Sequence, residues 1–250
     1  MAPASGELVA VSDLVHVAQT DLVNWVLIAG ADGVVLIDAG FPGQRGEVLA
    51  SLRQLGYHAA DVTAILLTHA HIDHLGTAIW FAAEYGTPVY CHADEIGHTQ
   101  RDHLEQASVA ALAMHAWHPR WLTWAVRILG KGALIRAGIP SARVFTEDVG
   151  ATLPGRPIAI PTPGHTGGHC SYLVDGLLVS GDALVTGHPT SGRRGPQLLP
   201  SVFNHDEAAC RRSLDALAML ETDVLIPGHG DVWHGPIREL TGRAALAGKT

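Results

Sequence analysis

The chain is poor in charge and in cysteine. Of its 250 residues only 16% are charged, and the formal net charge is −8. This balance leaves no domain-wide basic surface, so we expect no nucleic-acid partner. The three cysteines, Cys91, Cys170 and Cys210, form no CxxC pair. Their number and spacing favour a reducing compartment and buried, unreactive thiols.

A long apolar run is also missing. A membrane span needs about 20 residues without charge, and the nearest stretch, 121–139, contains Arg127, Lys131 and Arg136. The first residues show no basic region followed by an apolar core, so no secretory signal is expected. We therefore expect a soluble, cytoplasmic protein that acts on a small molecule. The sequence leaves its oligomeric state open.

Histidine is abundant, by contrast, with 16 copies. Histidine is the commonest metal ligand and a frequent acid–base group. The densest stretch is THAHIDHLG, which runs from Thr68 to Gly76 and holds three histidines and one aspartate. Such a concentration predicts a metal site.

Short apolar runs, each bounded by Gly, Pro, Asp or Asn, predict strands. They cover 24–30, 33–38, 63–68, 88–91, 156–160, 169–174, 177–180 and 223–226. Asp-Gly pairs between the first two runs, and between 169–174 and 177–180, predict hairpins.

Helical patterns fall between these runs. One covers 48–55, another begins near His74, and a third follows Asn204, which we expect to be its N-cap. Residues 94–137 read as two or three helices and interrupt the strand–helix alternation. We predict one α/β domain over 1–250, with an insertion at about 94–137.

The histidines of THAHIDHLG begin where the strand at 63–68 ends. Alternate residues of an extended segment point to one side, which groups His69 with His71 and Asp73. A turn near His74 would separate two clusters, His69/His71 and Asp73/His74. The spacing therefore favours two clusters over four ligands on a single ion.

Three more strands end in the same way. Apolar runs lead through glycine to His165, Asp182 and His229, in the segments TPGHTGGH, SGDAL and PGHG. Glycine allows tight turns and a close approach of the backbone to a site. Four such strand ends in one chain indicate a shared site.

Taken in this order, HAHIDH, PGHT, SGDAL and PGHG resemble the motifs of the metallo-β-lactamase superfamily, from about 24 to 230. The resemblance implies an α/β (α+β) fold, a four-layer αββα sandwich with the metals at one edge. Asp38, in LIDAG, matches the family's early aspartate and would support the site by contacting the metal ligands rather than the metals.

The same resemblance implies two metal sites. The first would be held by His69, His71 and His165. The second would be held by Asp73, His74 and His229, and Asp182 would bridge them. Imidazole and carboxylate ligands suit two Zn²⁺ ions, with iron or manganese as alternatives.

The implied chemistry is hydrolysis by a hydroxide that bridges two metals. Bound metal lowers the pKa of water to about 7 and polarises a carbonyl or phosphoryl oxygen. We take Asp73 as the catalytic residue that accepts the hydroxide's proton and passes it to the leaving group. No serine or cysteine nucleophile is then required.

Further residues are assigned around the metals. We expect His169 to orient His165, and His188 to meet substrate in a loop after Asp182. The Trp-rich insertion, with Trp117 and Trp121, would roof an apolar pocket. That pocket favours an ester, lactone or thioester over a charged phosphodiester.

Several branches of the family fit less well. Cysteine-using β-lactamases carry Cys at the position of Asp182, flavodiiron proteins carry an acid at that of Ala70, and many lactonases carry Tyr at that of Val185. Glyoxalase II matches all seven ligands, but only 21 residues follow His229, too few for its C-terminal domain. The alternatives are a mononuclear iron oxidoreductase resembling the persulfide dioxygenases, a phosphodiesterase, and a non-catalytic ligand-binding protein.

Overall fold

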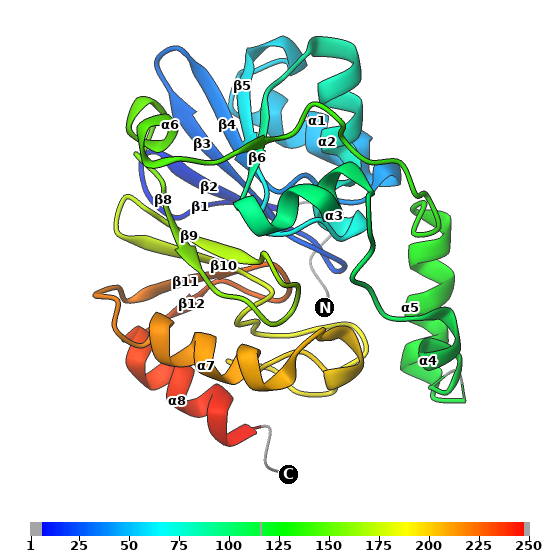
Figure 1. Ribbon diagram of the computed structural model, residues 1–250. Helices are drawn as coiled ribbons and strands as arrows, with labels where there is room; N and C mark the ends of the chain where they lie inside the picture. The colour runs from blue at the N-terminus through cyan, green and yellow to red at the C-terminus, as the bar shows by residue number, and fades with distance from the viewer. Residues whose placement is uncertain (1–6, 116, 248–250) are drawn as a thin grey trace.

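Two β-sheets lie face to face in the computed structural model, which describes residues 7–115 and 117–247 (Figure 1). The first sheet has the strand order β1-β2-β3-β4-β5-β6-β7 and the second the order β12-β11-β10-β9-β8. The strands of the first sheet are β1 (Glu7–Ala10), β2 (Val15–Gln19), β3 (Trp25–Gly30), β4 (Gly33–Ile37), β5 (Val62–Leu66), β6 (Val89–Cys91) and β7 (Arg143–Val144). Those of the second are β8 (Ile158–Pro161), β9 (Cys170–Val174), β10 (Leu177–Gly181), β11 (Val224–Pro227) and β12 (Trp233–His234).

Helices cover the outer face of each sheet, with α1 and α2 on the first and α7 and α8 on the second (Figure 1). The helices are α1 (Arg45–Gln54), α2 (Ile72–Tyr85), α3 (Ile96–Gln100), α4 (Val109–Ala113), α5 (Pro119–Gly130), α6 (Glu147–Thr152), α7 (Glu207–Leu217) and α8 (Ile237–Ala247). The layers are therefore αββα, as the resemblance implied. No helix in the described chain is long and apolar enough to cross a membrane.

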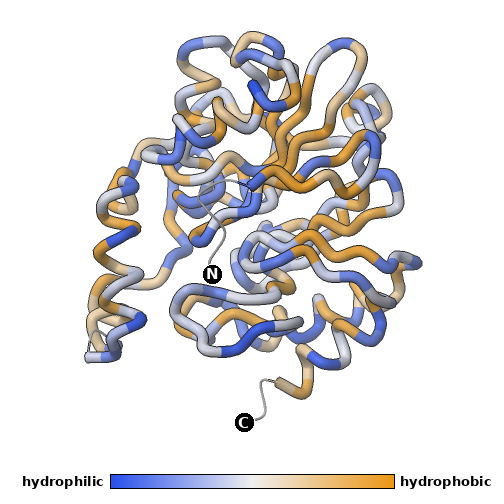
Figure 2. Tube along the Cα trace, turned by 180° about the vertical axis from the view of Figure 1, so that it is seen from behind, coloured by the Kyte–Doolittle hydropathy of each residue, from blue (hydrophilic) through white to orange (hydrophobic). Residues whose placement is uncertain are grey.

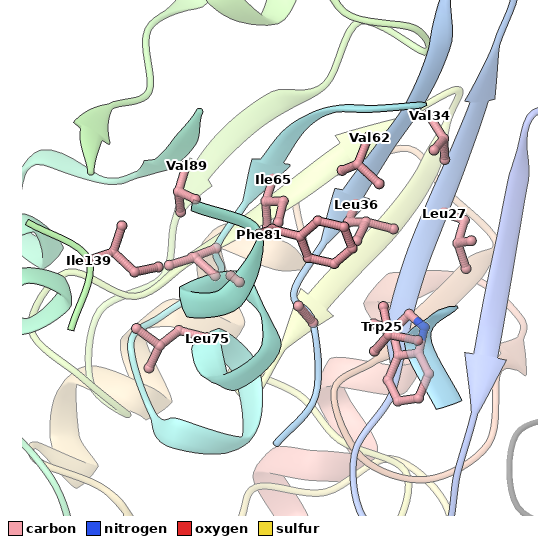
Figure 3. Packing of buried hydrophobic residues seen from close by; sticks show 14 of the residues in the cluster. Trp25, Leu27, Val34, Leu36, Val62, Ile65, Leu75, Phe81, Val89 and Ile139 are labelled. Atoms are coloured by element: carbon pink, nitrogen blue, oxygen red, sulfur yellow. The ribbon is translucent and has the colours of Figure 1, made fainter. Parts of the chain in front are cut away.

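Three apolar layers hold the sandwich together. Between the sheets, side chains such as Ile37 and Leu66 meet Tyr172 and Ile226 from the second sheet. The first sheet packs its other face on α1 and α2 through the cluster drawn in Figure 3, and the second packs on α7 and α8. Alternate residues of strands such as β4 point to different layers, so both faces are buried and the runs read as continuously apolar.

All eight predicted strands are present, with no end more than two residues from its predicted position, and both predicted hairpins are antiparallel pairs. The sequence did not predict β1, β2, β7 and β12, three of which are four residues long or shorter. The expected cap of α7 is wrong. Asp206, rather than Asn204, accepts the hydrogen bond from the backbone N–H of Ala209.

The insertion contains α3, α4 and α5. Helices α4 and α5 lie within residues 106–136, which we call the arm. The two helices run along one side of the sandwich (Figure 1). The inner side of the arm packs through Trp124, Ile128 and Ala133 against a small cluster that includes Leu22 and Phe41. The arm is therefore attached near the edge where β2 ends and β4 leads into α1.

Replacing Leu52 with alanine tests the outer layer. Leu52 lies in α1 and is fully buried against the first sheet. We expect Leu52→Ala to lower the free energy of unfolding by about 2–5 kcal/mol, because it removes apolar contacts and leaves a cavity. The control Leu246→Ala changes a side chain that is 68% exposed, and should shift stability by about 0.5 kcal/mol or less. Equal denaturation midpoints for the two variants would contradict this packing.

Candidate metal centre

The seven predicted ligands lie together at one edge of the sandwich. Strand β5 runs parallel to β4, and β10 runs parallel to β11, so their carboxyl ends meet at a common edge of each sheet. His69 and His71 follow β5, Asp182 follows β10 and His229 follows β11. The loop between β8 and β9 adds His165. Residues more than 150 positions apart thus reach one point.

Three imidazoles form the first cluster. His69 Nε2 lies 3.1 Å from His71 Nδ1, and His71 Nδ1 lies 2.9 Å from His165 Nε2. His69 and His165 are buried, and the ligand atoms of all three lie within 4.8 Å of one another. Three nitrogens that face one another at this distance suit a cation between them.

The second cluster adjoins the first. Asp73 Oδ2 lies 3.8 Å from His74 Nε2 and 3.6 Å from His229 Nε2. Asp182 connects the clusters, because its Oδ2 lies 3.3 Å from both His165 Nε2 and His229 Nε2. Its Oδ1 lies 3.5 Å from His74 Nε2. The position of Asp182 between two groups of donors is the one a bridging carboxylate requires.

Asp38 fixes two of the histidines from behind. Its carboxylate lies 2.8 Å from His74 Nδ1 and accepts hydrogen bonds from the backbone N–H and the hydroxyl of Thr68. Since the Thr68 hydroxyl donates its proton to Asp38, it accepts from Nδ1 of His69, 3.0 Å away. Asp38 itself adopts a left-handed φ of 60°, which Asp tolerates better than most residues.

The other three histidines have backbone or amide oxygens as outer partners. His71 Nε2 lies 2.6 Å from the carbonyl oxygen of Glu105, and His229 Nδ1 lies 2.5 Å from that of Leu22. His165 Nδ1 lies 3.1 Å from Asn204 Oδ1. Because each outer nitrogen donates its proton to an acceptor, each inner nitrogen keeps a free lone pair. Fixed tautomers of this kind are typical of metal-binding histidines.

The electrostatics of the two clusters differ. Burial, together with the neighbouring histidines, lowers the pKa of His69 and His165 well below its usual value. Burial also opposes the charged form of His74, yet the carboxylates of Asp182, Asp38 and Asp73 raise its pKa well above the usual value. The carboxylates thus draw positive charge into the site, which protons on His74 or a bound cation would supply.

Two buried atoms in the site, His74 Nε2 and Asp182 Oδ1, have no hydrogen-bond partner among the described residues. A buried polar atom without a partner costs about 1–3 kcal/mol. Metal coordination would satisfy both atoms. The donor set of imidazole nitrogens and carboxylate oxygens therefore fits zinc, iron or manganese.

Glycine permits the close packing around Asp182. A Cβ at Gly228 would lie 2.4 Å from Asp182 Oδ1, and one at Gly181 would lie 2.7 Å from Thr68 Cβ. Gly181 also has a φ of 51°. No larger residue fits at Gly181 or Gly228, the positions that directly precede Asp182 and His229 in the sequence.

Glu95 joins the two loops of the first cluster, and the sequence analysis did not identify it. This buried carboxylate accepts hydrogen bonds from the backbone N–H groups of Ala70 and Gly168, and from the Thr166 hydroxyl. Its Oε1 also lies 2.9 Å from His98 Nδ1. Glu95 therefore links the loop that carries His71 to the loop that carries His165. No motif marks it, because two of its four partners are backbone groups, which any residue type provides.

An apolar cavity of about 330 Å³ opens above the ligands. Its floor includes His71, Asp73, Asp182 and His229. Its walls come mainly from the arm and from a loop of the second sheet, and include Phe41, Leu112, Trp121, Leu122, Trp124, Ile128, Leu199 and Phe203.

The structure separates the two tryptophans assigned to this pocket. Trp121 lines the cavity and stacks on Phe203 at 5.4 Å between ring centroids. Trp117 is 82% exposed and does not line the cavity, so its assignment is wrong. It precedes α5, whereas Trp121 lies on the helix face that turns toward the ligands.

His169 and His188 both lie beside the ligands. His169 Nε2 accepts the backbone N–H of Asp182, while its Nδ1 lies 2.8 Å from the Thr162 hydroxyl. It therefore orients Asp182, in place of the expected His165. His188 lines the cavity, with its ring centroid 4.9 Å from that of His229.

The three cysteines take no part in the site. All are free and buried, as predicted, and burial raises the pKa of Cys91, Cys170 and Cys210 to about 12. A protonated thiol is neither a nucleophile nor a good metal ligand. The chemistry must therefore come from the histidines and carboxylates.

Fold and site together define the class of metallo-hydrolases. Residues 18–229 match the model of the family described as "Metallo-beta-lactamase superfamily", so the chain belongs to this superfamily. It is 28% identical over 215 residues to "Probable metallo-hydrolase YflN" of Bacillus subtilis (strain 168), covering 78% of this chain and 75% of that protein. It is 26% identical over 203 residues to a "Hydroxyacylglutathione hydrolase" of Xanthomonas axonopodis pv. citri (strain 306), covering 81% of this chain and 58% of that protein.

Solved structures show the same fold. The "Rm3 metallo-beta-lactamase" superimposes with a TM-score of 0.68 at 20% identity, over 99% of this chain and 94% of that one. At this level of identity the likeness supports the αββα sandwich and leaves the substrate to be argued from the cavity.

Replacing Glu95 with glutamine tests its role at the site. The amide offers one acceptor oxygen in place of two, and its NH₂ group would face hydrogen-bond donors. We expect Glu95→Gln to lower the free energy of unfolding by about 2–4 kcal/mol, measured by chemical denaturation. The exposed Glu84, on α2, provides the matched control Glu84→Gln. Equal stability of the two variants would show that Glu95 does not hold the loops.

Proposed function

We propose that the protein is a two-metal hydrolase of esters, lactones or thioesters that carry an apolar acyl or aromatic group. One observation carries the proposal. Five histidines, each with its outer nitrogen bound to an acceptor, direct their inner nitrogens toward two carboxylates at the floor of an apolar cavity. His69, His71 and His165 would hold one ion, Asp73, His74 and His229 the other, and Asp182 would bridge them.

When bound, two divalent ions would lower the pKa of a water molecule and polarise the oxygen of the scissile group. We assign the transfer of the proton to Asp73. Its side chain is 21% exposed, in contrast to the 3% of Asp182, and it lines the cavity. Asp73 can therefore take a proton from the attacking water and return it to the leaving group.

His188 is suited to hold the substrate's carbonyl oxygen. Its Nδ1 accepts the backbone N–H of Thr190 and lies 2.6 Å from the Thr190 hydroxyl, which leaves the proton on Nε2. Burial and nearby His229 lower the pKa of His188 well below its usual value, so the ring is neutral. A neutral N–H donor beside the metal ligands would bind an oxygen without repelling a cation.

The cavity wall favours an apolar substrate. No lysine or arginine is among the described residues that line it, whereas Leu, Ile, Val, Phe and Trp side chains are frequent. A phosphodiester would bring a fixed negative charge that only the metals at the floor could pair with, because the wall has no cationic side chain among its described residues. An acyl or aromatic group would instead bury apolar area there.

A hydrolysis panel on metal-quantified protein tests the proposal. We expect two equivalents of divalent metal per chain by mass spectrometry and turnover of carboxylic esters, lactones or thioesters. Because burial of each CH₂ contributes about 0.8 kcal/mol, kcat/KM should rise by roughly two- to fourfold per added acyl carbon. Asp182→Ala should abolish turnover, and Asp215→Ala, on exposed α7 surface, should not. One iron per chain, or turnover of phosphodiesters alone, would refute the proposal.

Asp73→Asn tests the proton-transfer role separately. The amide keeps the shape of the side chain but cannot accept a proton at neutral pH. We expect kcat to fall by about 10²–10⁴-fold. Metal content should be measured on the same sample, with Asp215→Asn as the control. Full turnover with both metals retained would remove Asp73 from the mechanism.

A further inference from the structure

The arm, residues 106–136, differs in charge from the rest of the chain. It contains four basic residues, Arg120, Arg127, Lys131 and Arg136, and none of the chain's 24 acidic residues. The other 12 basic and 24 acidic residues give the remaining chain a formal charge of −12. A positive arm thus projects from a strongly negative body.

The arm also exposes much apolar surface. In the described part of the chain, eight large hydrophobic side chains of the arm are at least 45% exposed. They are Val109, Met114, Trp117, Leu122, Val126, Leu129, Leu134 and Ile135. Figure 2 shows that the backbone of the arm carries both hydrophobic and hydrophilic residues along its length. Large exposed apolar patches on soluble proteins mark protein or membrane interaction sites.

The body of the protein does not cover these side chains. The inner face of α5 already packs on the Leu22 and Phe41 cluster through Trp124 and Ile128. Two ion pairs, Arg127 with Asp21 and Lys131 with Glu47, fasten the arm further. Arg136 is exposed, without an ion pair among the described residues. The outer side therefore offers both free cationic and apolar groups.

The mouth of the cavity opens on this same surface. Val109, Leu122, Leu129 and Leu134 line the cavity and are nevertheless 70%, 54%, 52% and 69% exposed. An apolar molecule could pass from a surface in contact with the arm into the cavity along these side chains. The exposed rim and the buried wall form one continuous apolar path.

We propose that the arm docks on a membrane surface that contains anionic lipid. Aliphatic and tryptophan side chains would enter the headgroup boundary, and arginine would pair with lipid phosphates. The body, at −12, would be repelled by the same surface, which orients the arm and the cavity mouth toward the lipid. A second copy that met the arm face to face would suit it less well as a partner, because the two positive arms would repel each other. Docking does not depend on the proposed hydrolysis.

Vesicle flotation of the full chain tests the proposal. We expect the protein to float with phosphatidylcholine vesicles that contain phosphatidylglycerol, and less with phosphatidylcholine alone or at high salt. The double variant Met114→Asp/Val126→Asp should reduce partitioning by about tenfold or more, because it places charge in the lipid boundary. Arg136→Glu should reduce binding to the anionic vesicles by several-fold, on the order of the loss of an ionic contact.

Matched variants serve as controls. Met219→Asp/Leu246→Asp alters side chains that are 74% and 68% exposed elsewhere, compared with 75% and 63% for Met114 and Val126. Arg53→Glu matches Arg136→Glu, and circular dichroism should show that every variant is folded. Absence of vesicle binding, or equal loss in the arm and control variants, would overturn the proposal. A second result would also overturn it: light scattering could show a dimer that does not bind vesicles and that dissociates only in the arm variant.

Discussion

One constraint governs this site: the lone pairs of several histidines and carboxylates lie close together in a buried space that excludes most water. Five imidazole nitrogens and two carboxylates face inward within a few ångströms of one another. Without positive charge between them, these lone pairs repel, and His74 Nε2 and Asp182 Oδ1 lack hydrogen-bond partners. The surrounding chain makes the arrangement permanent, because acceptors such as Asp38 and Asn204 fix each ring from its outer side. The fold is therefore built to hold a cation.

Much of this arrangement could be predicted from the sequence, because it follows strand ends. An apolar run, a glycine and a ligand-type residue recur before His165, Asp182 and His229, and parallel strands bring such ends to one edge. Short edge strands such as β7 and β12 were not predicted, since two residues leave almost no periodic pattern.

The orienting contacts could not be predicted in the same way. The partners of His71 and His229 are backbone carbonyls, which every residue type provides. Two of the four partners of Glu95 are backbone N–H groups, and Asn204 resembled a helix cap because asparagine can either cap a helix or accept a hydrogen bond from a histidine. Trp117 precedes α5 and Trp121 lies within it, and of the two only Trp121 lines the cavity. Such contacts are set by the packing of distant segments, and local patterns do not record them.

The site thus consists of two parts with different physical requirements. The floor is polar and is fixed by hydrogen bonds from both sheets, so a substitution there disturbs several ligands together. The roof is apolar, and a small cluster and two ion pairs attach it to the body. Because the roof contributes none of the seven proposed ligands, its side chains can change without displacing any of them. In the function proposed above, the floor accordingly determines the reaction, while the roof and its exposed rim determine which molecules reach it.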